Sequence, residues 1–292
     1  MLARFFTRLI DAQGVWARPL GEVYQRVPQA IFGPLRPVKD FLNGRWLGHP
    51  LHAALIDLPI GIYTLVIVFD LLGQREAAGI ALFLGIVSHA AAAVAGFADY
   101  TDTNGRPRMV ATVHSVLMSV AIVIYIVSLV MRSNSGDQTI PIVLSLVGYG
   151  LVTAGAYVGG EVVYTLGNMV NRHAWRFMGA GKWQALDVTE IPEGAPVKAK
   201  AGAQTLVLVR QGKTIHALHD TCAHAGGPLS EGRIVDGCIE CPWHGSRFDL
   251  ATGYKMRSPT TYDQPRFEVR ASDSGGWEAR RVTSGSAGTG EH

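Results

Sequence analysis

Charged residues are scarce in this chain. Asp, Glu, Lys and Arg make up 17% of its 292 residues, and the formal net charge is only +3. No basic patch with interleaved aromatic residues stands out, so nucleic acid is not expected as a partner. Hydrophobic residues reach 48% and the mean hydropathy is +0.19, which indicates membrane spans in a chain long enough for about two domains.

Cysteine is also scarce, with three residues at Cys222, Cys238 and Cys241. Cys222 and Cys241 each stand beside a histidine in a metal-ligand pattern, which leaves Cys238 without a partner for an intramolecular disulfide. A chain without an intramolecular disulfide suits a reducing compartment. The first forty residues carry scattered arginines and no long apolar core, so they do not predict a cleaved signal peptide.

Four apolar runs follow, each close to the ~20 residues that a helix needs to cross a bilayer. They lie at about 51–73, 77–98, 109–131 and 140–165. The alternative is a set of buried helices in a soluble protein, but runs this long with so few charges favour a membrane. Pro59 predicts a kink in the first run. The sequence shows no internal repeat, and its short polar connections predict an up-down-up-down four-helix bundle.

Lys and Arg near the spans predict the orientation of the bundle. One side holds twelve of them: Arg4, Arg8, Arg18, Arg26, Arg36, Lys39, Arg45, Arg106, Arg108, Arg172, Arg176 and Lys182. The other side holds Arg75 and Arg132. We therefore expect a multi-pass protein of the inner (cytoplasmic) membrane, with the N-terminus and the C-terminal domain in the cytoplasm.

The sequence changes to a β pattern after the fourth run. Strands are predicted at 205–209, 214–218, 233–235, 238–240, 267–270 and 277–280. The predicted organisation is a cytoplasmic or interfacial lead-in at 1–48, a membrane domain at 49–167, a linker at 168–184, a β-domain at 185–282 and a disordered Ser/Gly-rich tail at 283–292.

Two loops of the predicted β-domain each carry one cysteine and one histidine. Cys222-x-His224 precedes the Asp236-Gly237 hairpin signal and Cys241-x-x-His244 follows it, so the hairpin brings the two pairs together. Two thiolates and two neutral imidazoles form the donor set of an iron–sulfur cluster in which two His replace two Cys on one iron. A zinc site is the alternative, although zinc sites commonly pair Cys with Cys and His with His.

The sequence around these four residues resembles the Rieske family, and is closest to its soluble ferredoxin-like and oxygenase-associated branch. The matching segments are CAHAGGPL at 222–229 and CPWHGSRFD at 241–249, and the resemblance covers about residues 185–282. It implies one [2Fe–2S] cluster as the cofactor. The metal ligands are expected to be Cys222, His224, Cys241 and His244.

The chain departs from the respiratory branch of that family. Proteins of that branch tie the two loops with a disulfide, whereas the corresponding positions here are Gly227 and Trp243. Phe248 stands where that branch has a tyrosine whose hydroxyl bonds to a cysteine sulfur. With fewer hydrogen bonds to the reduced cluster, we expect a reduction potential in the lower part of the roughly −150 to +300 mV Rieske range. Gly226 and Gly245 permit tight turns whose amides can bond to the sulfurs.

The membrane half resembles small four-span bacterial membrane proteins grouped as domain of unknown function 2231. The residues that carry this resemblance are GHPLH at 48–52, LPIG at 58–61, GFADY at 96–100 and GGEVVY at 159–164. It covers about residues 46–170 and implies a fold and topology without an established activity. The two resemblances together imply an N-terminal all-α four-helix transmembrane bundle and a C-terminal all-β Rieske-type iron–sulfur domain.

Histidines and carboxylates lie in the predicted spans, where they are costly and often functional. One interpretation is a b-type haem held by two histidines across the bundle, with His89 and His114 as the preferred pair and His52 as the substitute ligand. A second is a quinone site with His52 or Asp57 as its proton partner. A third is a purely structural set of interhelical hydrogen bonds. The sequence leaves all three open.

Two functions are consistent with these features. The first is a membrane-bound electron carrier that passes single electrons between a soluble redox partner and a quinone or cofactor in the lipid bilayer. The second is a membrane-anchored ferredoxin component of an oxygenase system, but four spans exceed what an anchor needs. A terminal oxygenase requires an iron on two His and a carboxylate, and the only histidine after His244 is His292. No separate catalytic domain is therefore predicted.

Overall fold

The computed structural model describes residues 2–134, 136–174, 181–273 and 275–282. The chain divides into two compact units, one of Met1–Gly44 and His49–Asn168, and one of Arg45–Gly48 and Met169–His292. The predicted disordered tail at 283–292 lies outside the described residues, as does part of the predicted linker, 175–180.

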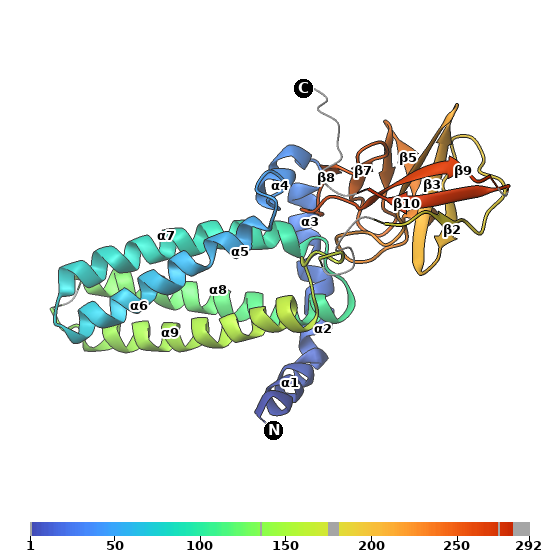
Figure 1. Ribbon diagram of the computed structural model, residues 1–292. Helices are drawn as coiled ribbons and strands as arrows, with labels where there is room; N and C mark the ends of the chain where they lie inside the picture. Colours follow the sequence, from blue (N-terminus) through green and yellow to red (C-terminus); the bar gives the residue numbers. More distant parts are fainter. Residues whose placement is uncertain (1, 135, 175–180, 274, 283–292) are drawn as a thin grey trace. The chain divides into compact units, whose positions relative to one another are not determined.

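The first unit is helical (Figure 1). Its elements are α1 (Leu2–Ala12), α2 (Gly14–Tyr24), α3 (Arg26–Phe32), α4 (Arg36–Leu42), α5 (Leu51–Leu55), α6 (Asp57–Leu71), α7 (Arg75–Tyr100), α8 (Gly105–Asn134), α9 (Thr139–Gly160) and the π-helical turn η1 (Glu161–Thr165). Among the described residues, four segments are long and apolar enough to cross a membrane: Leu51–Leu71, Arg75–Tyr100, Gly105–Asn134 and Thr139–Thr165. The four predicted runs are therefore confirmed as helices, with ends that differ by a few residues.

The first span is interrupted near its start. α5 ends at Leu55, four residues before Pro59, and α6 begins at Asp57, two residues before it. Proline has no N–H to donate to the carbonyl four residues earlier, and its ring crowds the preceding turn. The next backbone bond, from Ile60 N–H to the Ile56 carbonyl, is long at 3.5 Å. The irregularity expected from Pro59 thus falls in the turn just before it.

The four spans form a bundle in which α6 and α8 are diagonally opposite. α6 packs against α7 and α9, and α8 packs against the same two helices (Figure 1). Two separate groups of buried residues fill the interior. The first is Tyr63, Val66, Ala81, Leu82, Ala121, Tyr125 and Val152, and the second is Ile10, Ala17, Met109, Val110, Val113, Val158 and Val162. This topology is the up-down-up-down arrangement that the short connections predict.

The two halves of the bundle repeat the same contacts. A Cβ on Gly85 would come within 2.6 Å of the Tyr63 ring, and a Cβ on Gly148 within 2.9 Å of the Tyr125 ring. The two tyrosine rings stack at the bundle centre, 3.8 Å apart. Spans one and two therefore correspond to spans three and four. The sequence analysis found no repeat because the halves share a few contacting residues and little of their remaining sequence.

The N-terminal segment forms helices that pack on the bundle, and the sequence analysis did not predict them. α2 lies against α8, and α3 and α4 lie against α7. Gln25 donates to the carbonyls of Tyr100 and Thr103 at 2.9 and 2.7 Å. Lys39 forms a buried ion pair with Asp102 at 2.7 Å. Prolines inside α2 and α3 hide the helical pattern in the sequence. Polar contacts with the bundle help to hold these helices in place.

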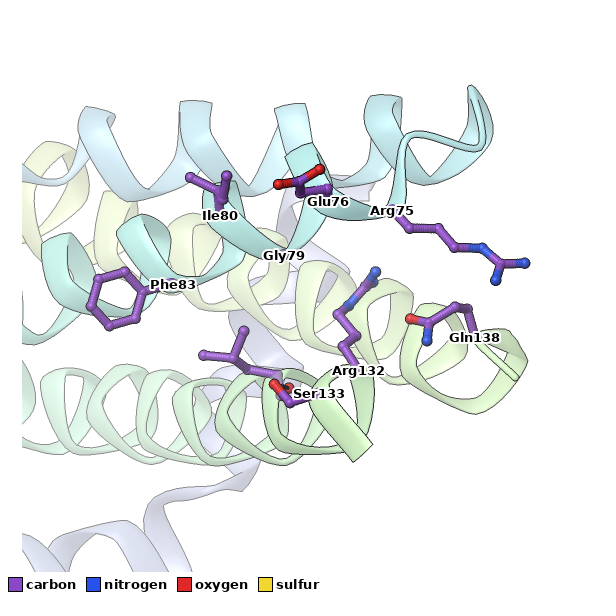
Figure 2. Close-up of a pocket in the computed structure, with 9 residues that line it drawn as sticks. Arg75, Glu76, Gly79, Ile80, Phe83, Arg132, Ser133 and Gln138 are labelled. Atoms are coloured by element: carbon purple, nitrogen blue, oxygen red, sulfur yellow. Dashed lines mark hydrogen bonds between the residues drawn. The ribbon is translucent and has the colours of Figure 1, made fainter. Parts of the chain in front are cut away.

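A buried ion pair joins the first and third spans at the opposite end of the bundle. Arg132 donates through both terminal nitrogens to the two carboxylate oxygens of Asp70, at 2.7 and 2.6 Å. The side chains are only 5% and 3% exposed. A cavity of about 480 Å³ lies beside the pair (Figure 2). It is lined by Arg75, Glu76, Gly79, Ile80, Phe83, Leu129, Arg132, Ser133 and Gln138.

The second unit is built from β-strands. They are β1 (Gln184–Ala185), β2 (Val197–Ala201), β3 (Gln204–Gln211), β4 (Thr214–His219), β5 (Arg233–Val235), β6 (Cys238–Glu240), β7 (Arg247–Asp249), β8 (Lys255–Arg257), β9 (Arg266–Ala271) and β10 (Trp277–Arg281), with a 3₁₀ turn η2 (Leu229–Glu231). The described strands form two antiparallel sheets, in the orders β1-β10-β9-β4-β3-β2 and β5-β6-β7-β8.

The smaller sheet carries the functional part of the unit. β5 and β6 form the predicted hairpin, and Asp236 and Gly237 at its turn have φ values of 50° and 74°. One buried core lies under this sheet: Val207, Val209, Leu218, Cys222, Ala223, Leu229, Ile239, Cys241, Phe248 and Leu250. Because Cys222 and Cys241 belong to this core, their loops are fixed by the packing beneath them.

Loss of the Asp70 carboxylate should destabilise the helical unit. Replacing Asp70 with Ala leaves the Arg132 charge buried without its partner, which costs about 3–5 kcal/mol of unfolding free energy. Thermal unfolding of the full chain in detergent, followed by helical circular dichroism, measures this loss. Asp11→Ala is the matched control, because the Asp11–Arg106 pair is 48% and 35% exposed and is worth about 0–1 kcal/mol. Equal unfolding temperatures for the two variants would contradict the prediction.

Candidate metal centre

The first ligand loop follows β4 and closes on itself. Cys222 N–H donates to the Gly227 carbonyl at 2.8 Å, and Gly226 N–H donates back to the Cys222 carbonyl at 3.0 Å. Gly226 has a φ of 86°, in the left-handed region that side chains with a Cβ rarely adopt. This closed turn holds Cys222 and His224 on one short segment.

The second ligand loop repeats the same turn between β6 and β7. Cys241 N–H donates to the Ser246 carbonyl at 2.8 Å, and Gly245 N–H donates back to the Cys241 carbonyl at 3.1 Å. Gly245 has a φ of 73° and occupies the place that the left-handed glycine has in the first loop. The two loops therefore share one backbone design, although His244 lies one residue further from its cysteine.

The two loops bring like side chains together. The Cys222 and Cys241 thiols are hydrogen-bonded to each other, and the His224 and His244 rings lie 5.0 Å apart at an angle of 89°. All four predicted ligands are thus gathered at one place, as a pair of sulfurs and a pair of imidazoles. This arrangement fits a cluster with two metal ions, one taking both sulfurs and the other both imidazoles.

A single tetrahedral ion fits the geometry less well. In the part of the chain that the structure describes, no three His, Cys, Asp or Glu side chains converge closely enough to hold one metal ion. A structural zinc site needs four ligands around one centre. The sorting into a sulfur pair and an imidazole pair therefore favours a two-metal cluster over zinc.

The Cys241 thiol is prepared to act as a thiolate. Its pKa is lowered to about 7, chiefly because it accepts a hydrogen bond from the Cys222 thiol. The backbone amides of Trp243 and His244 also point at this sulfur and lower the pKa further, while burial opposes them. Amides directed at a sulfur stabilise its charged form, which is the form that binds metal.

The Cys222 thiol is the proton-holding member of the pair. Its pKa is raised well above the ordinary value, first by the hydrogen bond that it donates to Cys241 and then by burial. The amides of His224 and Ala225 partly offset this effect. A bound metal would be held by both thiolates, so Cys222 would give up this proton when the metal binds.

Gly227 and Trp243, which stand where the respiratory branch has its disulfide cysteines, lie next to each other. A Cβ on Gly227 would lie 2.9 Å from the Cys241 sulfur and 3.0 Å from the Trp243 ring. Phe248 is fully buried at 0% exposure in the core below the loops. Close packing of the bare Gly227 backbone against the second loop thus replaces a covalent link here.

Gln264 fixes the first ligand loop from a distant part of the chain. Its Nε2 donates to the His219 and Thr221 carbonyls at 2.5 and 2.7 Å, and its Oε1 accepts from Ala223 N–H at 3.0 Å. The side chain is 3% exposed. The sequence analysis missed Gln264, because no local pattern links it to a loop about forty residues earlier.

Glu240 anchors the second ligand loop next to Cys241. Its carboxylate accepts hydrogen bonds from Arg233 and Arg247 at 2.6 Å and from Arg257 at 2.9 Å. Burial alone raises its pKa, but the hydrogen bonds from Arg247 and Arg233, with the charges of Arg247 and Arg257, lower it overall. This carboxylate therefore stays ionised and ties β5, β6, β7 and β8 together. The sequence analysis also missed Glu240, because its three partners lie on three other strands.

One more cysteine and one more histidine lie in this unit near the ligand loops. Cys238 is buried on β6 and contacts the Asp236 carbonyl through its sulfur at 3.7 Å. His219 is buried at the end of β4, where its Nδ1 accepts from Thr221 N–H at 3.1 Å. Both residues thus have contacts of their own in the β-unit.

The residues proposed for a haem or quinone site in the spans lie in three different environments. His52 and His114 lie across the bundle from each other, with ring centroids 6.2 Å apart. His89 instead contacts the Tyr63 hydroxyl through its Nδ1 at 3.2 Å. Asp57 is exposed at the start of α6. The structure thus pairs His114 with the substitute ligand His52 and places His89 elsewhere.

Comparison with known families agrees with both units. The family model of the Rieske [2Fe-2S] domain matches residues 181–268, and that of the predicted membrane proteins DUF2231 matches residues 48–172. The anthranilate 1,2-dioxygenase ferredoxin subunit of Burkholderia cepacia is 34% identical over 93 residues, which are 32% of this chain and 86% of that protein. Ferredoxin CarAc of Metapseudomonas resinovorans is 39% identical over 74 residues, which are 25% of this chain and 69% of that protein.

Solved structures match the same region. A chain of the complex of reduced oxygenase and oxidised ferredoxin in carbazole 1,9a-dioxygenase is 31% identical with a TM-score of 0.29, over 34% of this chain and 92% of that one. Dicamba monooxygenase bound to dicamba is 28% identical with a TM-score of 0.29, over 33% of each chain.

The chain belongs to the Rieske [2Fe-2S] family through its C-terminal domain, which is fused to a DUF2231 membrane domain. The Rieske domain implies a [2Fe–2S] cluster, and its homology to ferredoxin components of oxygenase systems implies electron transfer. The expected combination of a helical membrane domain and a β-type iron–sulfur domain is confirmed.

Removing the Gln264 amide should loosen the first ligand loop. Gln264→Leu removes the partner of the Ala223 N–H and a donor to the His219 carbonyl. The Thr221 carbonyl, by contrast, keeps its contact with His173 Nε2 at 2.8 Å. Each buried polar group left unsatisfied costs about 1–3 kcal/mol. The variant should lose the visible absorbance of its cluster at a lower urea concentration than the unmodified full chain. Gln211→Leu, at the exposed end of β3, is the control and should match the unmodified protein. The same urea midpoint for both variants would show that Gln264 does not hold the loop.

Proposed function

We propose that Cys222, His224, Cys241 and His244 hold the cluster and that the chain is a membrane-bound electron-transfer protein. The observation that carries this proposal is the sulfur pair beside the imidazole pair. When bound, the cluster supplies a centre that takes up and releases one electron. The protein residues direct four backbone amides at the two sulfurs, and these amides favour the charged thiolates that would bind the cluster. These are roles of a redox carrier and need no substrate pocket.

The second loop offers the route for electrons to and from the surface. Cys222 and Cys241 are buried, whereas His244 is half-buried and the adjacent Trp243 is 55% exposed. Electron transfer to a partner is therefore expected at the imidazole side of the cluster. The absence of a hydroxyl at Phe248 supports a low reduction potential, because one hydrogen bond fewer stabilises the reduced cluster.

A soluble redox protein is the proposed partner on one side. Two relatives are named as ferredoxin components, one of them of anthranilate 1,2-dioxygenase, which supports an oxygenase or reductase as that partner. On the other side we propose a quinone or a haem b in the lipid bilayer. The second candidate function is an oxygenase ferredoxin with a purely structural membrane domain, and it is favoured by the relatives alone.

The cluster ligands can be tested by a matched pair of variants. Cys241→Ser should abolish the low-temperature EPR signal of the dithionite-reduced full chain, because serine cannot replace the thiolate that binds iron. Cys238→Ser should keep the signal, since Cys238 is a buried strand residue outside the ligand group. A signal that survives in Cys241→Ser, or zinc instead of iron in the purified protein, would overturn the ligand assignment.

We propose further that both termini face the cytoplasm and that the protein lies in the inner membrane. The excess of Lys and Arg on one side of the spans supports this orientation. Fusions of the full chain should therefore give a fluorescent C-terminal green fluorescent protein and an inactive C-terminal alkaline phosphatase. Phosphatase fused after Gly73, in the first connection, is the positive control and should be active. The opposite pattern would reverse the orientation.

A further inference from the structure

A layer of small residues divides the interior of the helical bundle. Its facing positions are Ala92 and Gly96 on α7, and Gly155 and Gly159 on α9. The two groups of large buried side chains lie on either side of this layer and do not merge through it. Gly96 and Gly159 give the rings of His52 and His114 the space that a side chain would occupy, and Gly155 does the same for Met118.

His52 enters this layer from the first span in a fixed orientation. Its Nδ1 lies 2.8 Å from the Ala92 carbonyl, and a Cβ on Gly96 would come within 2.9 Å of its ring. A carbonyl only accepts hydrogen bonds, so Nδ1 must carry the proton, and Nε2 of the neutral ring keeps its lone pair. The ring is only half-buried. His52 is thus held as a ligand is held, with its other nitrogen available.

His114 occupies the equivalent place in the second half of the bundle. Its Nδ1 lies 2.8 Å from the Gly155 carbonyl, and a Cβ on Gly159 would come within 3.1 Å of its ring. It too is half-buried. Within the described residues, neither His52 nor His114 has a hydrogen-bond partner at Nε2. The repeat of the bundle therefore produces two matched imidazoles from diagonally opposite helices.

The separation of these rings suits two ligands on opposite sides of one metal. Their centroids are 6.2 Å apart and their planes cross at 81°. Two imidazole nitrogens at about 2 Å from a metal, with about 1 Å more from each nitrogen to its ring centre, give centroids roughly 6 Å apart.

The number of ligands identifies the kind of metal group. A bare ion in a protein usually needs three or four side chains, and no group of three His, Cys, Asp or Glu able to hold an ion occurs in the described residues. A haem iron needs only two axial ligands, because the porphyrin supplies the other four. The three cysteines of the chain all lie beyond residue 220, so covalent attachment of the c type is absent from the spans.

We propose that the bundle binds one b-type haem between His52 and His114, with the Nε2 atoms as axial ligands. His89 is not a ligand, because it has no matching histidine in the second half of the bundle, where the equivalent position is Val152. The haem is the membrane centre that the proposed electron carrier needs, and in this sense the inference rests on that function. Its residues are separate from the cluster ligands, so the two assignments can fail independently.

The test is haem content and spectrum of the full chain, expressed with haem supply and purified in detergent. The unmodified protein should contain one haem per chain by the pyridine haemochrome assay, and a low-spin ferric EPR signal of bis-imidazole type. His52→Ala and His114→Ala should each lose the low-spin signal and most of the haem, while His89→Ala should keep both. In all three variants the EPR signal of the reduced iron–sulfur cluster should persist, which shows that the β-unit is folded, and helical circular dichroism equal to that of the unmodified protein shows that the bundle is folded.

A rescue experiment separates ligation from misfolding. In His114→Gly, imidazole added with hemin should restore the low-spin spectrum, because the free ring fills the vacated ligand position. Haem absent from the unmodified protein, with no Soret shift on addition of hemin, would overturn the proposal. Haem lost in His89→Ala but retained in His52→Ala would also overturn it, as would zinc or copper bound in place of haem. Cys241→Ser should keep the haem, so failure of the cluster assignment would be seen separately.

Discussion

The contact between the Cys222 and Cys241 thiols is the constraint on which the second unit depends. Two negative sulfurs repel each other in a buried core, so they can be held together only with a shared proton or a metal cation between them. The β5–β6 hairpin and the two closed turns enforce this proximity, and Gln264 and Glu240 brace the loops from opposite sides. The backbone amides at the sulfurs then favour the charged state that a cluster requires.

The helical unit uses a comparable device. In each half of the bundle, an aromatic ring packs against a glycine of the neighbouring helix at two levels. The rings are Tyr63 and Tyr125 at one level, and His52 and His114 at the other. The tyrosine layer is closed, with rings stacked at 3.8 Å, whereas the histidine rings stand 6.2 Å apart with their Nδ1 atoms held by carbonyls. One layer thus supports the bundle, and the other is organised for a ligand. An electron carrier with a second centre in the membrane would account for four spans.

Sequence reasoning succeeded where a signal is local. The ligand spacing, the Asp236-Gly237 turn and the four apolar helices each follow from a short segment, and the structure has all of them at the expected places. The roles of Gln264 and Glu240 were not predicted, because each contacts segments that are distant in sequence. The pairing of His52 with His114 was only the substitute prediction, since depth along a helix does not reveal which way a ring points. The matching contacts in the two halves of the bundle, which only the structure reveals, show which way the histidine rings point.

The most direct test of the account is pulsed EPR of the reduced full chain labelled with ¹⁵N-histidine, together with a sulfide assay. The account predicts two acid-labile sulfides per chain and couplings from two histidine nitrogens to the reduced cluster. Unlabelled protein should show the corresponding ¹⁴N couplings. A cluster without histidine coupling, or a protein with no labile sulfide and bound zinc, would contradict the claim that this chain carries electrons through Cys222, His224, Cys241 and His244.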